Sequence, residues 1–378
     1  MSQKILLFDM DGVLLEPGGY HKALTETVRL IGESLGYKNV ELTPADIAAF
    51  EAAGITSEWD SSALCFVWLM LPLWERFPSL GIPATLTEGL FPSERGLAPE
   101  WDALFDKLNQ PPSEFGSPVI RAEQTLASGH PREQFIRQIL RDAYSIEKSL
   151  TYRIFQELVL GSPIFAETYS LLPWFESESF LSQFDRPNLT SEQRTMLLNW
   201  LAEDGHQAAI FTNRPSRHGG LSTPEAEIGA QRVGLATLPI VGYGDMLWLS
   251  QQRGVDVGAL RKPSPAHTLA ALLRARGVDA ETALYLAADL ALDGRNMSEW
   301  HQFQSVEVHV FEDTSAGLMS AQAAQGILQE LGLNSFWHYF GISAVKAKQA
   351  ALRSVGAEVF FSLPEALMAG LVRGSLSK

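Results

Sequence analysis

Cysteine is almost absent from this chain of 378 residues, since Cys65 is the only one. A single cysteine excludes an intramolecular disulfide and any metal cluster held by several thiolates. Such sparse usage suits a reducing compartment, so a cytoplasmic location is expected.

Long apolar runs are missing too. The strongest run, residues 63–74, contains Pro72 and is shorter than the ~20 residues that a membrane helix needs. The first run, residues 5–8, gives way at once to aspartates, so we expect no secretion signal. We therefore expect no membrane partner, and we expect residues 63–74 to be the end of a buried helix.

Basic residues are fewer than acidic ones, with 29 Lys and Arg against 44 Asp and Glu and a formal net charge of −15. This excess of negative charge offers no overall counter-charge to a phosphate backbone, so nucleic acid is not an expected partner. The eight histidines show neither an H-x-H nor an H-E-x-x-H pattern, and the sequence thus indicates no histidine metal site.

Short apolar runs alternate with helical patterns through the second half of the chain. A capping box at Thr190 and Gln193 predicts the start of one of these helices. Strands separated by helices imply parallel crossovers, so the sequence predicts an α/β fold with a Rossmann-like parallel sheet. The expected strands are residues 5–8, 208–211, 238–241, 306–311 and 357–361.

Residues 17–189 have a different character, with helical stretches rich in Leu, Phe and Trp. They separate the first expected strand from all the others. The sequence thus predicts a discontinuous α/β core, residues 1–16 and 190–378, and a large inserted α-helical domain, residues 17–189.

Two acids, Asp9 and Asp11, follow the first expected strand and precede Gly12. Ligands bind beyond the carboxyl ends of the strands in open parallel sheets, where a glycine permits close approach of the backbone. Two carboxylates there could hold Mg²⁺, which prefers hard oxygen ligands. The structural alternative is an Asx turn that caps the next segment.

The stretch F-D-M-D-G-V, residues 8–13, resembles the first motif of the haloacid dehalogenase-like (HAD) superfamily, an apolar strand that ends in D-x-D-G-[TV]. The resemblance implies that Asp9 is a nucleophile that forms an aspartyl-phosphate. It also implies that Asp11 is the acid/base that protonates the leaving group and then activates water. By the same resemblance, the second aspartate favours phosphoryl transfer over dehalogenation, and the inserted domain would be a C1-type helical cap.

Two further motifs follow in the family's order. Thr212 and Asn213, after the strand at 208–211, resemble the second motif, in which a hydroxyl and a backbone N–H bind a phosphate oxygen. Lys262, in the K-P-S-P stretch 262–265, resembles the third motif and would stabilise the phosphoryl charge and bind the substrate. We expect Arg214 to be an exposed loop residue and His267 to lie on a helix surface.

The fourth motif, which completes the metal site, has two candidates. Asp289 and Asp293 have the family's D-x-x-x-D form but lie in a stretch of Ala and Leu, which favours a helix. Glu312 and Asp313 follow a clean strand pattern and resemble the E-D-[ST]-x-x-G form of phosphoglucomutase-like members. We choose the second pair, which requires an extra helical insertion before it.

The resemblance as a whole implies a Mg²⁺-dependent phosphohydrolase that acts on a small phosphorylated metabolite, with Asp9, Asp11, Glu312 and Asp313 at the metal. A phosphomutase on the same site is one alternative. A non-catalytic binding protein of the same fold is another.

Overall fold

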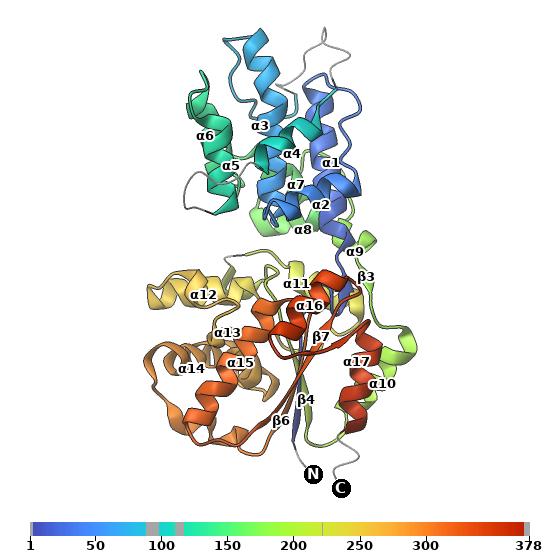
Figure 1. Cartoon of the computed structure of the whole chain (residues 1–378), viewed down its shortest axis with the longest axis vertical. Helices are drawn as coiled ribbons and strands as arrows, with labels where there is room; N and C mark the ends of the chain where they lie inside the picture. The colour runs from blue at the N-terminus through green and yellow to red at the C-terminus, as the bar shows by residue number, and fades with distance from the viewer. Residues whose placement is uncertain (1–2, 88–97, 110–116, 221, 374–378) are drawn as a thin grey trace. The chain divides into compact units, whose positions relative to one another are not determined.

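The computed structural model describes residues 3–87, 98–109, 117–220 and 222–373. The chain divides into two compact units, which Figure 1 shows. One combines Met1–Pro17 with Asp185–Lys378, and the other is Gly18–Phe184. The assignment of these parts as catalytic core and cap stays a prediction.

The first unit contains a six-stranded sheet in the order β5-β4-β1-β6-β7-β8, and every neighbouring pair is parallel. The predicted α/β fold with a Rossmann-like parallel sheet is therefore confirmed. The strands are β1 (Lys4–Phe8), β4 (His206–Phe211), β5 (Ile240–Val241), β6 (Glu307–Glu312), β7 (Phe336–Ile342) and β8 (Glu358–Phe360). Only β7 was not predicted, although the aromatic residues of its sequence FWHYFGI favour a strand.

Helices cover both faces of this sheet. Side chains alternate along β1, so that Ile5 and Leu7 join one apolar cluster while Leu6 and Phe8 join the other. The first cluster takes in α12 (Tyr243–Arg253), α13 (Pro265–Ala275), α14 (Ala280–Asp293), α15 (Ser315–Glu330) and α16 (Lys346–Ser354). The second takes in α10 (Ser191–Leu201), α11 (Glu225–Val233) and α17 (Leu363–Arg373). The capping box predicted at Thr190 is present and begins α10.

The register of the sheet places three strand ends together. Phe8, the last residue of β1, is aligned with Ile210 of β4 on one side and with Phe311 of β6 on the other. The residues that follow these strands therefore emerge at one edge of the sheet, the carboxyl edge at which ligands bind in open α/β sheets.

A short antiparallel ribbon joins β2 (Leu15–Glu16) to β3 (Arg186–Pro187). The Asn188 side-chain amide supports it by donating a hydrogen bond of 2.9 Å to the Val13 carbonyl. Three 3₁₀ turns, His218–Gly220, Val257–Ala259 and Met297–Phe303, complete the regular structure described in this unit.

The second unit is built on α1, which packs against α3, α7 and α9. Its described helices are α1 (Gly18–Ser34), α2 (Pro44–Ala52), α3 (Glu58–Arg76), α4 (Trp101–Leu108), α5 (Pro118–Ala127), α6 (Glu133–Arg141), α7 (Leu150–Leu160), α8 (Ser162–Tyr169) and α9 (Phe180–Phe184). The predicted buried helix at 63–74 is confirmed as part of α3, in which Cys65 is fully buried.

Among the helices of the described residues, none combines the length and the apolar character that crossing a membrane requires.

Candidate active site

A buried lysine joins two carboxylates at the carboxyl edge of the sheet. Nζ of Lys262 lies 2.7 Å from Oδ1 of Asp9 and 2.6 Å from Oε2 of Glu312. Lys262 reaches this position from the loop before α13, where the Ser264 side chain caps the helix and Pro265 is its first residue. The structure thus brings together three residues from three separate predicted motifs.

Glu312 is held through both carboxylate oxygens. Its Oε2 accepts the hydrogen bond from Lys262, and its Oε1 accepts hydrogen bonds from the backbone amides of Asp313 and Thr314 and from the Thr314 hydroxyl. A Cβ at position 317 would lie 1.8 Å from Oε2, so only glycine fits there. Glu312 is therefore a fixed anchor for the lysine.

Burial shifts the pKa values of all three charged groups in this cluster. Burial, and then the charge of Glu312, raises the pKa of Asp9 to about 7 despite the nearby lysine. Burial also raises the pKa of Glu312. Burial by itself would lower the pKa of Lys262. The negative charges of Asp9 and Glu312 outweigh this effect, so the pKa of Lys262 is raised. The lysine is charged at neutral pH, while Asp9 gains or loses its proton near that pH.

Oxygen atoms of Asp9, Glu312 and Asp313 all lie within 4.8 Å of one another. Asp313 Oδ2 accepts a hydrogen bond of 2.8 Å from Lys348, and burial, followed by the charge of Asp9, raises the pKa of Asp313 to about 6. Gly12 makes room for this carboxylate. Its φ is +75°, and a Cβ there would lie 2.3 Å from Asp313 Oδ2.

Arg214 holds Asp11, and the prediction that Arg214 is an exposed loop residue was wrong. Arg214 is 3% exposed. Its Nε donates to both oxygens of Asp11, at 3.0 and 2.8 Å, and its Nη2 donates to Oδ1 at 2.5 Å. Its Nη1 donates to the fully buried Asp185 at 2.9 Å. A lone arginine on a loop gives no sequence signal for such a role, because both partners are distant in the chain.

Thr212 and Asn213 lie at the end of β4, on the same edge. Thr212 is 1% exposed, and its hydroxyl oxygen accepts a hydrogen bond of 3.1 Å from the Arg214 amide. Asn213 is exposed. Both residues follow the strand as the motif requires, and their phosphate-binding roles stay predictions.

His267 is buried, so its expected place on a helix surface was wrong. Its Nδ1 accepts from the Lys262 amide at 3.4 Å, and its Nε2 donates to the Val241 carbonyl at 3.0 Å. Burial, helped by the charge of Lys262, lowers the pKa of His267 to about 3. This neutral ring holds the lysine loop against β5.

Asp289 and Asp293, the rejected fourth-motif candidates, lie on helix α14 and both pair with Arg253. Asp289 also accepts a hydrogen bond of 2.6 Å from the Asn296 side chain. The structure therefore places them on a helix with their own partners, whereas Glu312 and Asp313 stand beside Asp9.

Comparison with known proteins adds one clear likeness. No family model matches the chain, and no curated protein matches it. A crystal structure from the Northeast Structural Genomics Consortium, described without a function, has a TM-score of 0.65 at 18% sequence identity, and the match covers 100% of this chain and 99% of the other. A phosphatase from Thermococcus thioreducens gives a TM-score of only 0.40 at 14% identity, over 88% of this chain and 91% of its own. The first match shows a shared fold, whereas the second is too weak to support a conclusion.

Proposed function

We propose that this chain is a Mg²⁺-dependent phosphohydrolase of the HAD-like superfamily, which hydrolyses a small phosphorylated metabolite through an aspartyl-phosphate on Asp9. The observation that carries the proposal is the contact of Lys262 with both Asp9 and Glu312 at the carboxyl edge of a parallel sheet. A pure binding protein has no need for a nucleophilic carboxylate held against a buried ammonium group.

The first step would use Asp9 as the nucleophile. Its carboxylate oxygen forms a bond to phosphorus while the bond from phosphorus to the leaving oxygen breaks, and Asp11 donates a proton to that oxygen. Lys262 neutralises negative charge on Asp9 and on the phosphoryl oxygens that approach it. The pKa of Asp9, raised to about 7, leaves a substantial ionised fraction at neutral pH.

The second step would restore the enzyme. Asp11 takes a proton from water, the water oxygen forms a bond to phosphorus, and the bond between phosphorus and Asp9 breaks to release inorganic phosphate. Arg214 holds both oxygens of Asp11 and thereby fixes the direction of its carboxylate. Asp11 exposes 34% of its side chain, so water can reach it.

The donor set fits Mg²⁺. Asp9, Glu312 and Asp313 supply clustered carboxylate oxygens, the hard ligands that this ion prefers. Among the described residues, Oδ2 of Asp9 and Oδ1 of Asp313 accept no side-chain hydrogen bond, so these two residues would hold the ion. Asp11 and Glu312 are already engaged, by Arg214 and Lys262. When bound, the ion would neutralise charge on the phosphoryl group and on the buried carboxylates.

Thr212 supports phosphate recognition. Because its oxygen accepts from the Arg214 amide, its own hydroxyl proton is left to donate to a phosphoryl oxygen. Asn213 follows at the exposed rim, where its backbone N–H would be a second donor. A cytoplasmic location and the absence of a nucleic-acid partner accompany this proposal as expectations from composition.

The test is phosphate release from a panel of phosphorylated metabolites, with Mg²⁺ and with EDTA. The proposal expects release that depends on the metal and is lost in Asp9→Asn and Asp313→Asn, while Asp289→Asn keeps it. Isomerised products without net phosphate would favour the phosphomutase alternative. No reaction with any substrate would favour a binding protein.

A further inference from the structure

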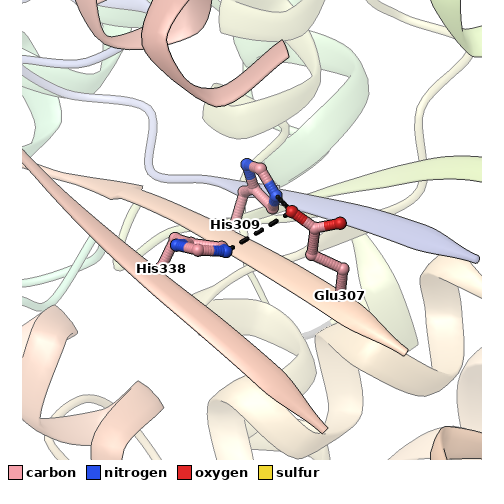
Figure 2. A group of neighbouring side chains, drawn as sticks. All are labelled: Glu307, His309 and His338. Atoms are coloured by element: carbon pink, nitrogen blue, oxygen red, sulfur yellow. Dashed lines mark hydrogen bonds and ion pairs between the residues drawn. The ribbon is translucent and has the colours of Figure 1, made fainter. Parts of the chain in front are cut away.

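Three potential metal ligands meet at the amino end of the sheet, opposite the edge that carries Asp9. Glu307 is the first residue of β6, His309 lies two residues on, and His338 of β7 is aligned with His309 in the parallel register. Residues two apart on a strand share a face, and so do aligned residues on neighbouring strands. The fold therefore gathers all three side chains on one face, as Figure 2 shows.

The donor atoms already converge. Nε2 of His309 lies 2.8 Å from Oε1 of Glu307, and Nε2 of His338 lies 3.4 Å from the same oxygen (Figure 2). The ligand atoms of the three residues all lie within 4.8 Å of one another. His309 is buried, whereas His338 exposes 33% of its side chain, so the cluster is open to solvent on one side.

The second ring nitrogen of His309 can carry the ring proton. Nδ1 of His309 has no hydrogen-bond partner among the described residues. An ion bound at Nε2 would replace the contact with Glu307 and requires the ring proton on Nδ1, a nitrogen that no other donor among these residues occupies.

We propose that Glu307, His309 and His338 bind a divalent transition metal ion of the Zn²⁺ class, with water completing the coordination. Two imidazoles and one carboxylate form a ligand set that suits such ions and that hard Mg²⁺ does not favour. The ion would tie β6 to β7. Glu307 and Glu312 stand five residues apart on a strand that rises ~3.3 Å per residue, roughly 16 Å, so this site is separate from the carboxylate cluster and does not depend on the proposed phosphatase activity.

Lys4 lies beside the proposed site and allows a specific test of it. On β1 it is aligned with Glu307, and its Nζ lies 3.8 Å from Oε2, the oxygen that the histidines do not contact. An ammonium group so close opposes a bound cation by like-charge repulsion. Its removal should therefore tighten metal binding, which a merely structural Glu–His contact would not explain.

The experiment uses the full chain, stripped of metal with EDTA and kept in excess Mg²⁺ to occupy the carboxylate cluster. Zn²⁺ affinity is measured by competition with a chromophoric chelator, and the visible absorption of bound Co²⁺ reports nitrogen ligands. Loss of a residue that only hydrogen-bonds a metal ligand typically weakens metal affinity about tenfold or more. Because His338 is proposed to be a ligand itself, His338→Ala should weaken Zn²⁺ affinity by at least as much. His338 is partly exposed, so this variant should fold, and an unchanged melting temperature without metal verifies it.

The matched controls are His301→Ala, which removes an exposed histidine from another part of the unit, and Asp313→Asn. Both should keep wild-type Zn²⁺ affinity, and Lys4→Met should bind Zn²⁺ more tightly. The proposal is overturned if wild type binds no Zn²⁺ in excess Mg²⁺, if His338→Ala binds it as well as wild type, or if Lys4→Met leaves the affinity unchanged.

Discussion

Nζ of Lys262 lies 2.7 Å from Oδ1 of Asp9, although 253 positions separate the two residues in the sequence. The lysine also contacts the ring of Phe211, with Nζ 3.8 Å from the ring centroid, and its side chain is 2% exposed. A charge buried in this way is stable only because Asp9 and Glu312 neutralise it. The contact links the fold of the sheet directly to the chemistry proposed at its edge.

Replacement of Lys262 should abolish most turnover. Lys262→Met removes the charge that faces the nucleophile, and the loss of one such group typically costs about a hundredfold to a thousandfold in kcat. Lys348→Met is the matched control. Lys348 pairs with Asp313, but its side chain is 55% exposed, and exposed ion pairs contribute ~0–1 kcal/mol, so turnover should fall less than about fivefold. Equal losses in steady-state kinetics would contradict the assignment.

Asp9→Asn should make the metal-free protein more stable at alkaline pH. The pKa of Asp9 is raised from 3.8 to about 7, so its contribution to stability is fully present below pH 3.8 and is lost as pH rises through 7. Asparagine does not ionise, so the variant does not lose stability in this pH range. Thermal unfolding in EDTA should show a Tm advantage for the variant that grows as the pH is raised through this window.

Addition of Mg²⁺ should reverse that order, because the ion stabilises the wild type by binding its folded state and binds the variant weakly. A variant whose Tm runs parallel to that of the wild type at every pH would show that Asp9 is not held in a raised-pKa state.

Gly12→Ala should weaken metal binding. A Cβ at position 12 would lie 2.3 Å from Oδ2 of Asp313, so this carboxylate must move. Gly294→Ala is the matched control, because Gly294 also has a positive φ, +63°, but a Cβ there meets nothing within 4 Å. Both variants should lose ~1 kcal/mol of stability from backbone strain. Only Gly12→Ala should require more Mg²⁺ for half-maximal activity. If both variants require the same Mg²⁺ concentration, the close approach of Gly12 to the Asp313 carboxylate has no effect on metal binding.

Arg214→Lys should impair both stability and turnover. A single ammonium group cannot hold two oxygens of Asp11 and also reach Asp185, as the guanidinium does. Because Asp185 is buried, loss of its charge partner should cost about 3 kcal/mol in the free energy of unfolding. Arg261→Lys, at an exposed position, should change neither quantity in urea unfolding and kinetics. Wild-type behaviour of Arg214→Lys would mean that the clamp on Asp11 has no function.

The sequence predicted those parts of the site that carry local signals. Asp9 was selected because it follows an apolar strand pattern and precedes Asp11 and Gly12, and Lys262 was selected because its K-P-S-P stretch resembles a family motif. Arg214 was missed because its role depends on Asp11 and Asp185, which only the folded chain brings near. The cluster of Glu307, His309 and His338 was missed for the same reason, since its third member comes from β7, whose register with β6 no local motif encodes.

The measurement that tests the central claim most directly is the search for a phosphoryl group on Asp9. Wild type and Asp11→Asn are mixed with the best substrate and Mg²⁺, quenched in acid, and analysed by peptide mass spectrometry. The account predicts phosphate on the peptide that contains Asp9, and this phosphoenzyme should decay more slowly in Asp11→Asn, because water is no longer activated for the second step. Turnover without any phosphoenzyme, or phosphate attached to another residue, would contradict it.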